Sequence, residues 1–315
     1  MSVLVYTESW EGSFRKSTYE AVSYASETAK ILETDVIALS FGNISNDELA
    51  KLGNYGANKI LTTNGIEKGD SQAATDFFAA NSADASIIIF SSTYTSKMIA
   101  PRLAARLKAG IASNVINLPS SISPLKIKRK AFSSKAFETT SINTEKGIII
   151  LAPNAFGLIE CQEKNYEIEK TEISTDTRIT INGQEVSGGK VSLAEAETII
   201  SAGRGLKGPE NWGMIEELAG ILGAATACSK PVSDIGWRPH SEHVGQTGKA
   251  VAPNLYIAIG ISGAIQHLAG VNSSKIMVAI NTDPEAPFFK AANYGIVGDA
   301  FEIVPKLIEE IKKIR

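Results

Sequence analysis

The chain is poor in the residues that mark several common protein classes. Its 315 residues include two cysteines and three histidines, and 31 Lys and Arg against 34 Asp and Glu leave a net charge of −3. Cys161 and Cys228 lie far apart without C-x-x-C spacing, which predicts reduced thiols in a reducing compartment instead of a disulfide framework or a zinc site. Because the charge is near neutral and no basic block is present, we expect no nucleic-acid partner.

Long apolar runs and targeting signals are also lacking. No run approaches the roughly 20 apolar residues of a membrane span, and residues 1–6 lead directly into a strand pattern without a charged or Arg-rich leader. We therefore expect a cytoplasmic bacterial protein without membrane insertion. His240 and His243 have H-x-x-H spacing, but no third ligand follows at a familiar interval, so no metal site is predicted.

Short apolar runs are abundant. Hydrophobic residues make up 43% of the chain, which is enough for two ordinary domain cores. In the first half these runs alternate with amphipathic stretches, a pattern typical of an α/β fold with a helix-covered parallel or mixed sheet. We expect strands at 3–7, 35–40, 59–62, 86–90 and 146–151, a helix with Val22, Ala25, Ala29 and Leu32 on its buried face, further helices at 46–51, 71–81 and 96–108, and extended antiparallel strand over 126–142.

A shift in composition predicts the domain boundary. Between about residues 165 and 190 the chain becomes rich in Glu, Thr and Ser and contains two glycine turn signals. We place the domains at 1–187 and 188–315. The turn after the first strand, residues 7–12, has two acids and no clustered glycines, which is unfavourable for a phosphate. The first domain is therefore expected to dock on a partner and to hold no nucleotide of its own.

In the second domain, a strand, a glycine turn and a helix follow one another. Residues 255–259 are apolar at almost every position, as in a strand buried on both faces. Gly260 and Gly263 permit a sharp turn, Ser262 is a plausible N-cap, and residues 264–269 can form a helix that Gly270 stops. The backbone N–H groups at such a helix start favour an anion such as pyrophosphate. The spacing departs from G-x-G-x-x-G, which argues against an ordinary nicotinamide site.

Polar residues follow other predicted strands of this domain. Arg204 stands between two glycines after the strand at 198–202, where the backbone could approach a phosphate closely. Gln246 and Thr247 offer an amide and a hydroxyl of the kind that a flavin ring needs, although they also suit an ordinary polar turn. His267, taken alone, is more often a core or surface residue than a ligand. Further elements are expected as a helix with Ile215, Leu218, Leu222 and Ala225 on one face, strands at 275–280 and 294–298, and a helix at 304–315.

The order of the motifs in the last third decides between these alternatives. From about residue 198 onward, their order and spacing closely resemble the FAD-binding domain of the electron transfer flavoprotein alpha subunit. The motifs are Ser201-Ala-Gly-Arg-Gly-Leu-Lys-Gly208, Ala227-Cys-Ser-Lys-Pro231, Val244-Gly-Gln-Thr-Gly248, Gly260-Ile-Ser-Gly-Ala-Ile-Gln-His267, Val278-Ala-Ile-Asn-Thr-Asp-Pro-Glu-Ala-Pro287 and Tyr294-Gly-Ile-Val-Gly-Asp299.

The resemblance implies FAD as the cofactor and assigns roles to individual residues. It puts the Thr247 hydroxyl near flavin N5, has His267 donate toward flavin O2, and has the turn at 262–265 bind the phosphates. Lys230 stands where the family usually has Arg, so the positive charge beside the reduced ring is kept while the planar fork is lost. The complete predicted set is Arg204, Ser229, Lys230, Val244, Gly245, Gln246, Thr247, Ser262, Gly263, Ala264, Ile265, Gln266, His267, Asn281, Asp299 and Ala300, of which Asn281, Asp299 and Ala300 would hold the adenosine portion.

The resemblance also implies partners and a fold for the first domain. That domain would be Rossmann-like, of the adenine nucleotide alpha hydrolase-like type, and would dock on a beta subunit that carries AMP. The heterodimer would carry electrons from acyl-CoA and other flavin dehydrogenases, as in fatty acid beta-oxidation, to a quinone oxidoreductase without substrate chemistry of its own. Two alternatives are a flavin- or nicotinamide-dependent oxidoreductase acting on a small substrate and a nucleotide-binding regulatory module without redox function.

Overall fold

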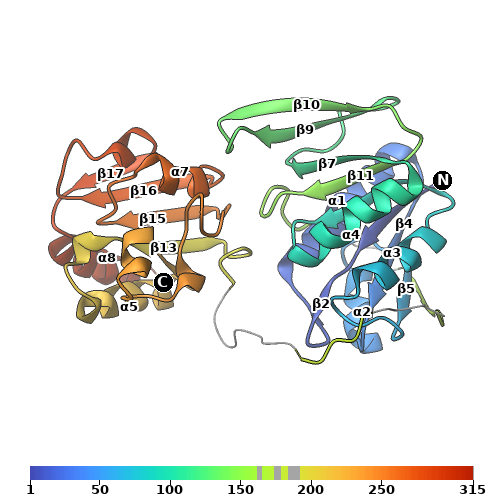
Figure 1. Ribbon diagram of the computed structural model, residues 1–315, viewed down its shortest axis with the longest axis horizontal. Helices are drawn as coiled ribbons and strands as arrows, with labels where there is room; N and C mark the ends of the chain where they lie inside the picture. The colour runs from blue at the N-terminus through green and yellow to red at the C-terminus, as the bar shows by residue number, and fades with distance from the viewer. Residues whose placement is uncertain (162–164, 174–178, 184–191, 315) are drawn as a thin grey trace. The chain divides into compact units, whose positions relative to one another are not determined.

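The computed structural model describes residues 1–161, 165–173, 179–183 and 192–314. The chain divides into two compact units, the first formed by residues 1–131 and 136–186 and the second by residues 132–135 and 187–315. Figure 1 follows the chain from the blue start of the first unit to the red end of the second. The predicted boundary between residues 187 and 188 lies outside the described residues.

The first unit is built on a sheet whose strands alternate with helices. A separate ribbon pairs β2 (Ser9–Trp10) with β3 (Ser13–Phe14). The other elements are β1 (Ser2–Tyr6), α1 (Lys16–Leu32), β4 (Asp35–Phe41), α2 (Asn46–Gly53), β5 (Lys59–Thr63), α3 (Ser71–Ala80), β6 (Ala85–Ser91), α4 (Tyr94–Leu107), β7 (Gly110–Val115), β8 (Ser121–Ile122), β9 (Leu125–Ala131), β10 (Ala136–Ile142), β11 (Gly147–Leu151) and β12 (Glu167–Lys170).

The main sheet is mixed, with the strand order β10-β9-β7-β11-β6-β1-β4-β5-β12. From β7 to β12 all neighbours are parallel, whereas β9 pairs antiparallel with β7, β8 and β10. The stretch expected to be extended, 126–142, forms the β9–β10 hairpin. The α/β class and the Rossmann-like arrangement of this unit are confirmed.

The central strand β1 contributes to a core on each face of this sheet, because alternate residues of a strand point to opposite sides. Val3 and Val5 pack with apolar residues of α1 and α2. Leu4 and Tyr6 pack with residues of α3 and α4 on the other face. Burial on both faces explains why these strands read as continuous apolar runs in the sequence.

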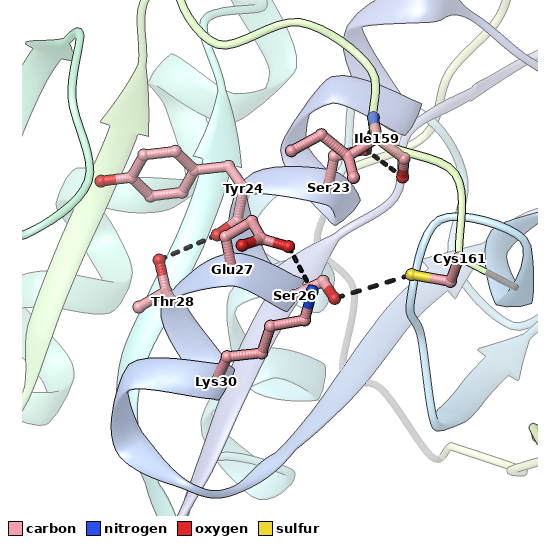
Figure 2. A network of polar contacts seen from close by, with 8 residues as sticks. All are labelled: Ser23, Tyr24, Ser26, Glu27, Thr28, Lys30, Ile159 and Cys161. Atoms are coloured by element: carbon pink, nitrogen blue, oxygen red, sulfur yellow. Dashed lines mark hydrogen bonds and ion pairs between the residues drawn. The ribbon is translucent and has the colours of Figure 1, made fainter. Parts of the chain in front are cut away.

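Helix α1 also binds the segment that returns after β11. The Ser23 hydroxyl accepts a hydrogen bond from the Ile159 amide at 3.1 Å, and the Ser26 hydroxyl lies 4.0 Å from the Cys161 sulfur, as Figure 2 shows. On the same helix, Thr28 donates to the Tyr24 carbonyl at 2.8 Å. Cys161 and Cys228 are both free.

The second unit contains a five-stranded parallel sheet in the order β14-β13-β15-β16-β17. Helices α5 and α8 pack on one face, and α7 with the loops around it contributes to the core on the other. The elements are β13 (Thr198–Ala202), η1 (Arg204–Leu206), η2 (Pro209–Trp212), α5 (Gly213–Leu222), β14 (Ala225–Cys228), α6 (Lys230–Asp234), η3 (His240–Glu242), β15 (Leu255–Ile259), α7 (Ile265–Val271), β16 (Ile276–Asn281), η4 (Pro287–Lys290), β17 (Tyr294–Val297) and α8 (Ala300–Ile314).

Three predicted details of this unit are wrong. Ala225 starts β14 and does not extend the buried face of α5, because Gly223, with φ of +63°, ends that helix. Helix α8 begins at Ala300, four residues earlier than expected. Helix α7 starts after Ala264 without a side-chain cap from Ser262, and it continues through Gly270 to Val271.

Candidate functional site

The carboxyl ends of the five parallel strands lie along one edge of the second sheet. With β13 as the first strand in the chain, the strand order is 2-1-3-4-5, so the direction of winding reverses between β13 and β15. Open α/β sheets bind ligands at the carboxyl edge beside such a reversal. Every residue of the predicted site lies at the end of one of these strands or in the loops and helix starts that follow them.

The predicted residues divide into a solvent-facing set and a supporting set. Asn281 and Asp299 are half-buried. The exposed residues are Arg204, Lys230, Gln246, Thr247, Ser262, Ala264, Ile265 and Gln266, and the buried residues are Ser229, Val244, Gly245, Gly263, His267 and Ala300. Ile265 is 71% exposed although it is apolar. An exposed isoleucine among polar groups is a suitable contact for a ligand with an apolar ring system.

Three glycines, Gly203, Gly205 and Gly260, allow close backbone contact between the loops that follow β13 and β15. The Gly203 amide donates to the Ile259 carbonyl at 2.9 Å, and the Gly205 amide donates to the Gly260 carbonyl at 3.2 Å. A Cβ built on Gly203 would lie 2.3 Å from the Gly260 oxygen, and one built on Gly205 would lie 2.6 Å from Gly260 Cα. The glycines around Arg204 therefore permit close contact between these two loops.

The turn before α7 is held by backbone packing. Gly263 has φ of +85°, which favours glycine. A Cβ there would lie 2.5 Å from the Phe288 nitrogen, and that same amide donates to the Ser262 carbonyl at 3.0 Å. With its carbonyl used in this way, the exposed Ser262 side chain stays available to a ligand at the first turn of α7.

The loop at residues 244–248 is attached to α7. The Gln246 amide donates to the Gln266 carbonyl at 2.7 Å, and a Cβ on Gly270 would lie 2.6 Å from both Cα and the nitrogen of Gly245. Gly270 therefore permits close approach of this loop, which explains why a glycine occurs inside the helix and does not end it. The attachment fixes the backbone beneath the exposed side chains of Gln246 and Thr247.

His267 is the buried polar centre of the site. Its residue is 7% exposed, its Nε2 lies 3.0 Å from the Tyr256 hydroxyl, and its ring packs 6.0 Å from that of Phe288. Burial is the largest cause that lowers the pKa of His267 to about 4; the electrostatic interaction with His243 lowers it further, and the Val244 backbone opposes the shift. The ring is therefore neutral at pH 7.

The other nitrogen of His267 has an unused capacity for a hydrogen bond. Nδ1 is buried and has no partner of normal geometry within the described ranges. Burying a polar atom without a partner is costly. A ligand that completes this bond would remove that cost, so an unpaired Nδ1 fits a cofactor that brings its own polar edge to the loops.

The positive side chains of the site differ in their pairing. Lys230, which begins α6 directly after Ser229, and Arg204 are both exposed, and neither forms an ion pair within the part of the chain that the structure describes. Lys207 lies 3.4 Å from Asp299. Two unpaired cations at the edge of the sheet favour an anionic ligand.

Asp299 and Asn281 have structural partners of their own. Asp299 accepts from the Phe301 amide at 3.0 Å, and this bond is the largest cause that lowers the pKa of its carboxyl. Asn281 donates to the Ile261 carbonyl at 3.1 Å and accepts from the Asp283 amide at 3.1 Å. Asn281 thus ties the loop after β16 to the loop after β15, while both side chains retain capacity for further hydrogen bonds.

Sequence reasoning missed a buried ion pair beside the site. Arg238 forms two hydrogen bonds with Glu242, of 2.7 and 2.8 Å, and a third with Glu216 at 2.9 Å. Its guanidinium also lies 5.3 Å from the centre of the Trp212 ring. The i, i+4 spacing of Arg238 and Glu242 was the only signal. The pair holds the chain between α6 and the 244–248 loop against α5.

The chemistry of the edge fits FAD. Exposed donors at Gln246 and Thr247, unpaired cations and the unsatisfied His267 nitrogen together match a large anion with a polar ring. No catalytic acid–base pair or nucleophile was predicted there. The described residues contain no group of three or more His, Cys, Asp or Glu placed to hold a metal ion. Among the same residues, no helix has the length and apolar character to cross a membrane.

Comparison with known proteins identifies the family. The electron transfer flavoprotein domain matches residues 3–176, and the electron transfer flavoprotein FAD-binding domain matches residues 192–272. The chain is 39% identical to the electron transfer flavoprotein subunit alpha of Bacillus subtilis, over 99% of this chain and 98% of the relative. The corresponding protein of Syntrophomonas wolfei is 33% identical over 98% of each chain, and that of Pseudomonas aeruginosa is 32% identical over 98% of this chain and 99% of its own. The chain therefore belongs to the electron transfer flavoprotein alpha subunits, a family of electron carriers with an FAD-binding domain.

Proposed function

We propose that this chain is the FAD-binding subunit of a heterodimer that carries electrons from acyl-CoA and other flavin dehydrogenases to a quinone oxidoreductase. The full-length match to alpha subunits carries the proposal. Their names favour a carrier over the alternatives of a small-substrate oxidoreductase and a regulatory module. A beta subunit would complete the site, dock on the first unit and hold AMP, and the heterodimer would work in the bacterial cytoplasm.

The residues of the carboxyl edge would divide the binding of FAD between them. Ser262, Gly263, Ala264 and Ile265 would receive the phosphates at the first turn of α7, with Arg204 as the opposing charge. At the other side of the site, Asn281, Asp299 and Ala300 would bind the adenosine portion through their remaining bonding capacity. This division uses the chain segments that follow four neighbouring strands, β13, β15, β16 and β17, which hydrogen bonds already join.

The flavin ring would lie against the 244–248 loop. When bound, FAD supplies reversible uptake of electrons. Gln246 and Thr247 would orient the ring by hydrogen bonds, Val244 and Gly245 would support them, and Gln266 would fix the loop through its carbonyl. His267, neutral at pH 7, would donate from Nδ1 in the tautomer that leaves Nε2 to accept from Tyr256.

Lys230 would supply positive charge beside the reduced ring, positioned by the buried Ser229. Cations near a flavin favour its reduced and more negative form. The primary ammonium lacks the planar fork of an arginine, so it would act through charge and not through stacking. The reduced form should therefore bind more weakly, relative to the oxidised form, once this charge is removed.

The proposal is tested by purifying the full chain with its co-encoded partner and recording the visible spectrum and FAD content. We expect flavin absorption bands and about one FAD for each alpha chain. In Lys230→Ala, the ratio of oxidised to reduced affinity should change roughly tenfold, measured from the midpoint potential. Lys275→Ala is the control, because exposed Lys275 precedes β16 at the opposite edge of the sheet. An intact heterodimer that holds no flavin would refute the proposal.

A further inference from the structure

We propose that His243 is a positioning residue of the flavin site. Its ring supports the 244–248 loop from the buried side and, when protonated, places a positive charge beneath that loop. This inference rests on the function proposed above and deepens it. The sequence drew attention to His243 only for its spacing from His240. The structure gives the two histidines different surroundings, since His243 is buried and His240 is exposed.

The position of His243 is fixed by backbone hydrogen bonds on both sides. Its amide donates to the His240 carbonyl at 3.1 Å, and its carbonyl accepts from the Lys249 amide at 2.9 Å. It also forms a bridge with Cys228 at the end of β14. The residue is 6% exposed. The imidazole is therefore held at the base of the loop that leaves and returns between residues 243 and 249.

The imidazole fills the inside of this loop. A Cβ built on Gly248 would lie 2.8 Å from both Cγ and Nδ1 of His243. A Cβ on Gly245 would lie 3.3 Å from Nε2 of the same ring and 3.2 Å from the Gln266 carbonyl oxygen. The ring thus occupies the space that side chains at both glycines would need. It reaches toward the first turn of α7.

The loop residues between these glycines face the solvent. Gln246 and Thr247 are exposed, and they are the two side chains assigned to the flavin ring. Within the loop, the Gly248 amide donates to the Gly245 carbonyl at 3.1 Å. A short turn packed on one ring from its inner side can present its outer side chains in one arrangement. His243 therefore acts on the cofactor through Gln246 and Thr247, without touching it.

The ring has capacity for a change of charge. Its nitrogens form no hydrogen bond within the described stretches of the chain. Burial is the largest cause that lowers the pKa of His243 below 6.5; Lys230 and His240 lower it further, and Asp234 opposes them. On α7, His267 is the other titratable group that interacts with it. At neutral pH the ring is therefore uncharged, and it takes up a proton as the pH falls.

Protonation of His243 would couple to reduction of the flavin. A positive ring beneath the loop favours negative charge on the cofactor above it, and by reciprocity negative charge there favours a protonated ring. The proton comes from water and the electrons come from the flavin dehydrogenase of the proposed function. No bond to the cofactor is formed or broken by His243. The result is a reduction potential whose dependence on pH includes a contribution from this residue.

The test compares His243→Gln with His240→Gln in the purified heterodimer. The midpoint potential of bound FAD is measured between pH 8 and pH 5. As the pH falls from 8 to 5, the affinity for reduced relative to oxidised FAD should rise in the wild type and in His240→Gln. This rise should be on the order of tenfold larger than the rise in His243→Gln. If His243→Gln follows the same curve as the other two proteins, the inference is wrong.

A second measurement needs no substitution, since loss of a buried ring can disturb folding. The imidazole of His243 is titrated by NMR in the wild-type heterodimer, with FAD first oxidised and then reduced. We expect its pKa to rise on reduction, and equal values would overturn the inference. If the heterodimer binds FAD but either measurement gives the negative result, the inference fails and the proposed function still stands. Absence of FAD from the wild type would instead refute both.

Discussion

The buried imidazole of His267 should make the second unit sensitive to acid. Its pKa is about 4 in the folded chain, whereas an unfolded histidine titrates near 6.5. The unfolded state therefore binds more protons between these values, so stability is complete above about pH 6.5 and is lost as the pH falls toward 4. At 1.36 kcal/mol for each pH unit, the full loss is roughly 3 kcal/mol. Between pH 7 and pH 5 it is about 2 kcal/mol.

The perturbation is His267→Gln, which does not titrate. Its free energy of unfolding should fall between pH 7 and pH 5 by about 2 kcal/mol less than that of the wild type. His243 contributes a loss of the same sign in both proteins, so most of its contribution drops out of the comparison between them. The absolute stability of the variant at pH 7 does not enter the argument, because only the change with pH is compared.

The assay is urea unfolding followed by tryptophan fluorescence. The chain has three tryptophans, so a Trp10→Phe background leaves Trp212 and Trp237, both in the second unit, as the reporters. The two proteins are compared in the same FAD state, since ligand binding shifts stability by mass action. Parallel curves of unfolding free energy against pH would show that His267 is not held neutral by burial.

Two further substitutions test the supports of the site. Gly263→Ala should lower the free energy of unfolding by about 2–4 kcal/mol, because Gly263 has a positive φ and an added Cβ would clash with backbone. The control Gly220→Ala, in an open part of a helix, should instead raise the free energy of unfolding by about 0.5–1 kcal/mol. Equal effects of the two substitutions in urea unfolding would contradict the geometry. Glu242→Ala removes two charge-assisted hydrogen bonds from partly buried Arg238, which keeps its bond to Glu216, and should cost about 2 kcal/mol. Glu310→Ala, at an exposed ion pair, should change stability by less than about 1 kcal/mol in the same assay, and a cost for Glu242→Ala as small as this would exclude a buried ion pair.

Several of the strands that sequence reasoning found are largely buried, apolar strands. Short runs of apolar residues in the sequence predict β1, β6, β11, β13 and β15. Two of the missed strands are strands only because of their partners in the fold. β12 has the sequence Glu-Ile-Glu-Lys and exists as the edge partner of β5, and β7 contains two polar residues between its buried positions.

Helix ends show which local signals were used and which were neglected. Gly223 was available in the sequence to end α5 before Ala225, since a left-handed glycine commonly follows a helix. The start of α8 at Ala300 was also signalled, because Asp299 accepts from the Phe301 amide at the N-terminus. Gly270 was expected to end α7, but the helix continues through it. The glycine is needed for close contact with Gly245, a tertiary feature that no local sequence pattern shows.

For the candidate site, motifs indicated which loops matter, and the fold supplies the reason that they lie together. Polar residues after successive parallel strands share an edge, so the predicted set could be grouped without coordinates. The stacking of Tyr256 on Phe288, which encloses His267, could not be anticipated, since the two aromatics are far apart in sequence. The same holds for the burial of His243, which depends on how the 244–248 loop folds back.

The contact of Gly203 and Gly205 with Gly260 joins two loops by backbone alone. Because backbone packs directly on backbone there, no flexible side chain can adjust to a relative displacement. The turn that carries Arg204 and the turn before α7 should therefore move together. An engineer who enlarges either loop to accept a different cofactor would therefore shift the other as well. Successful redesign has to move both loops as a matched pair, or add length on the side of each loop that faces away from the contact.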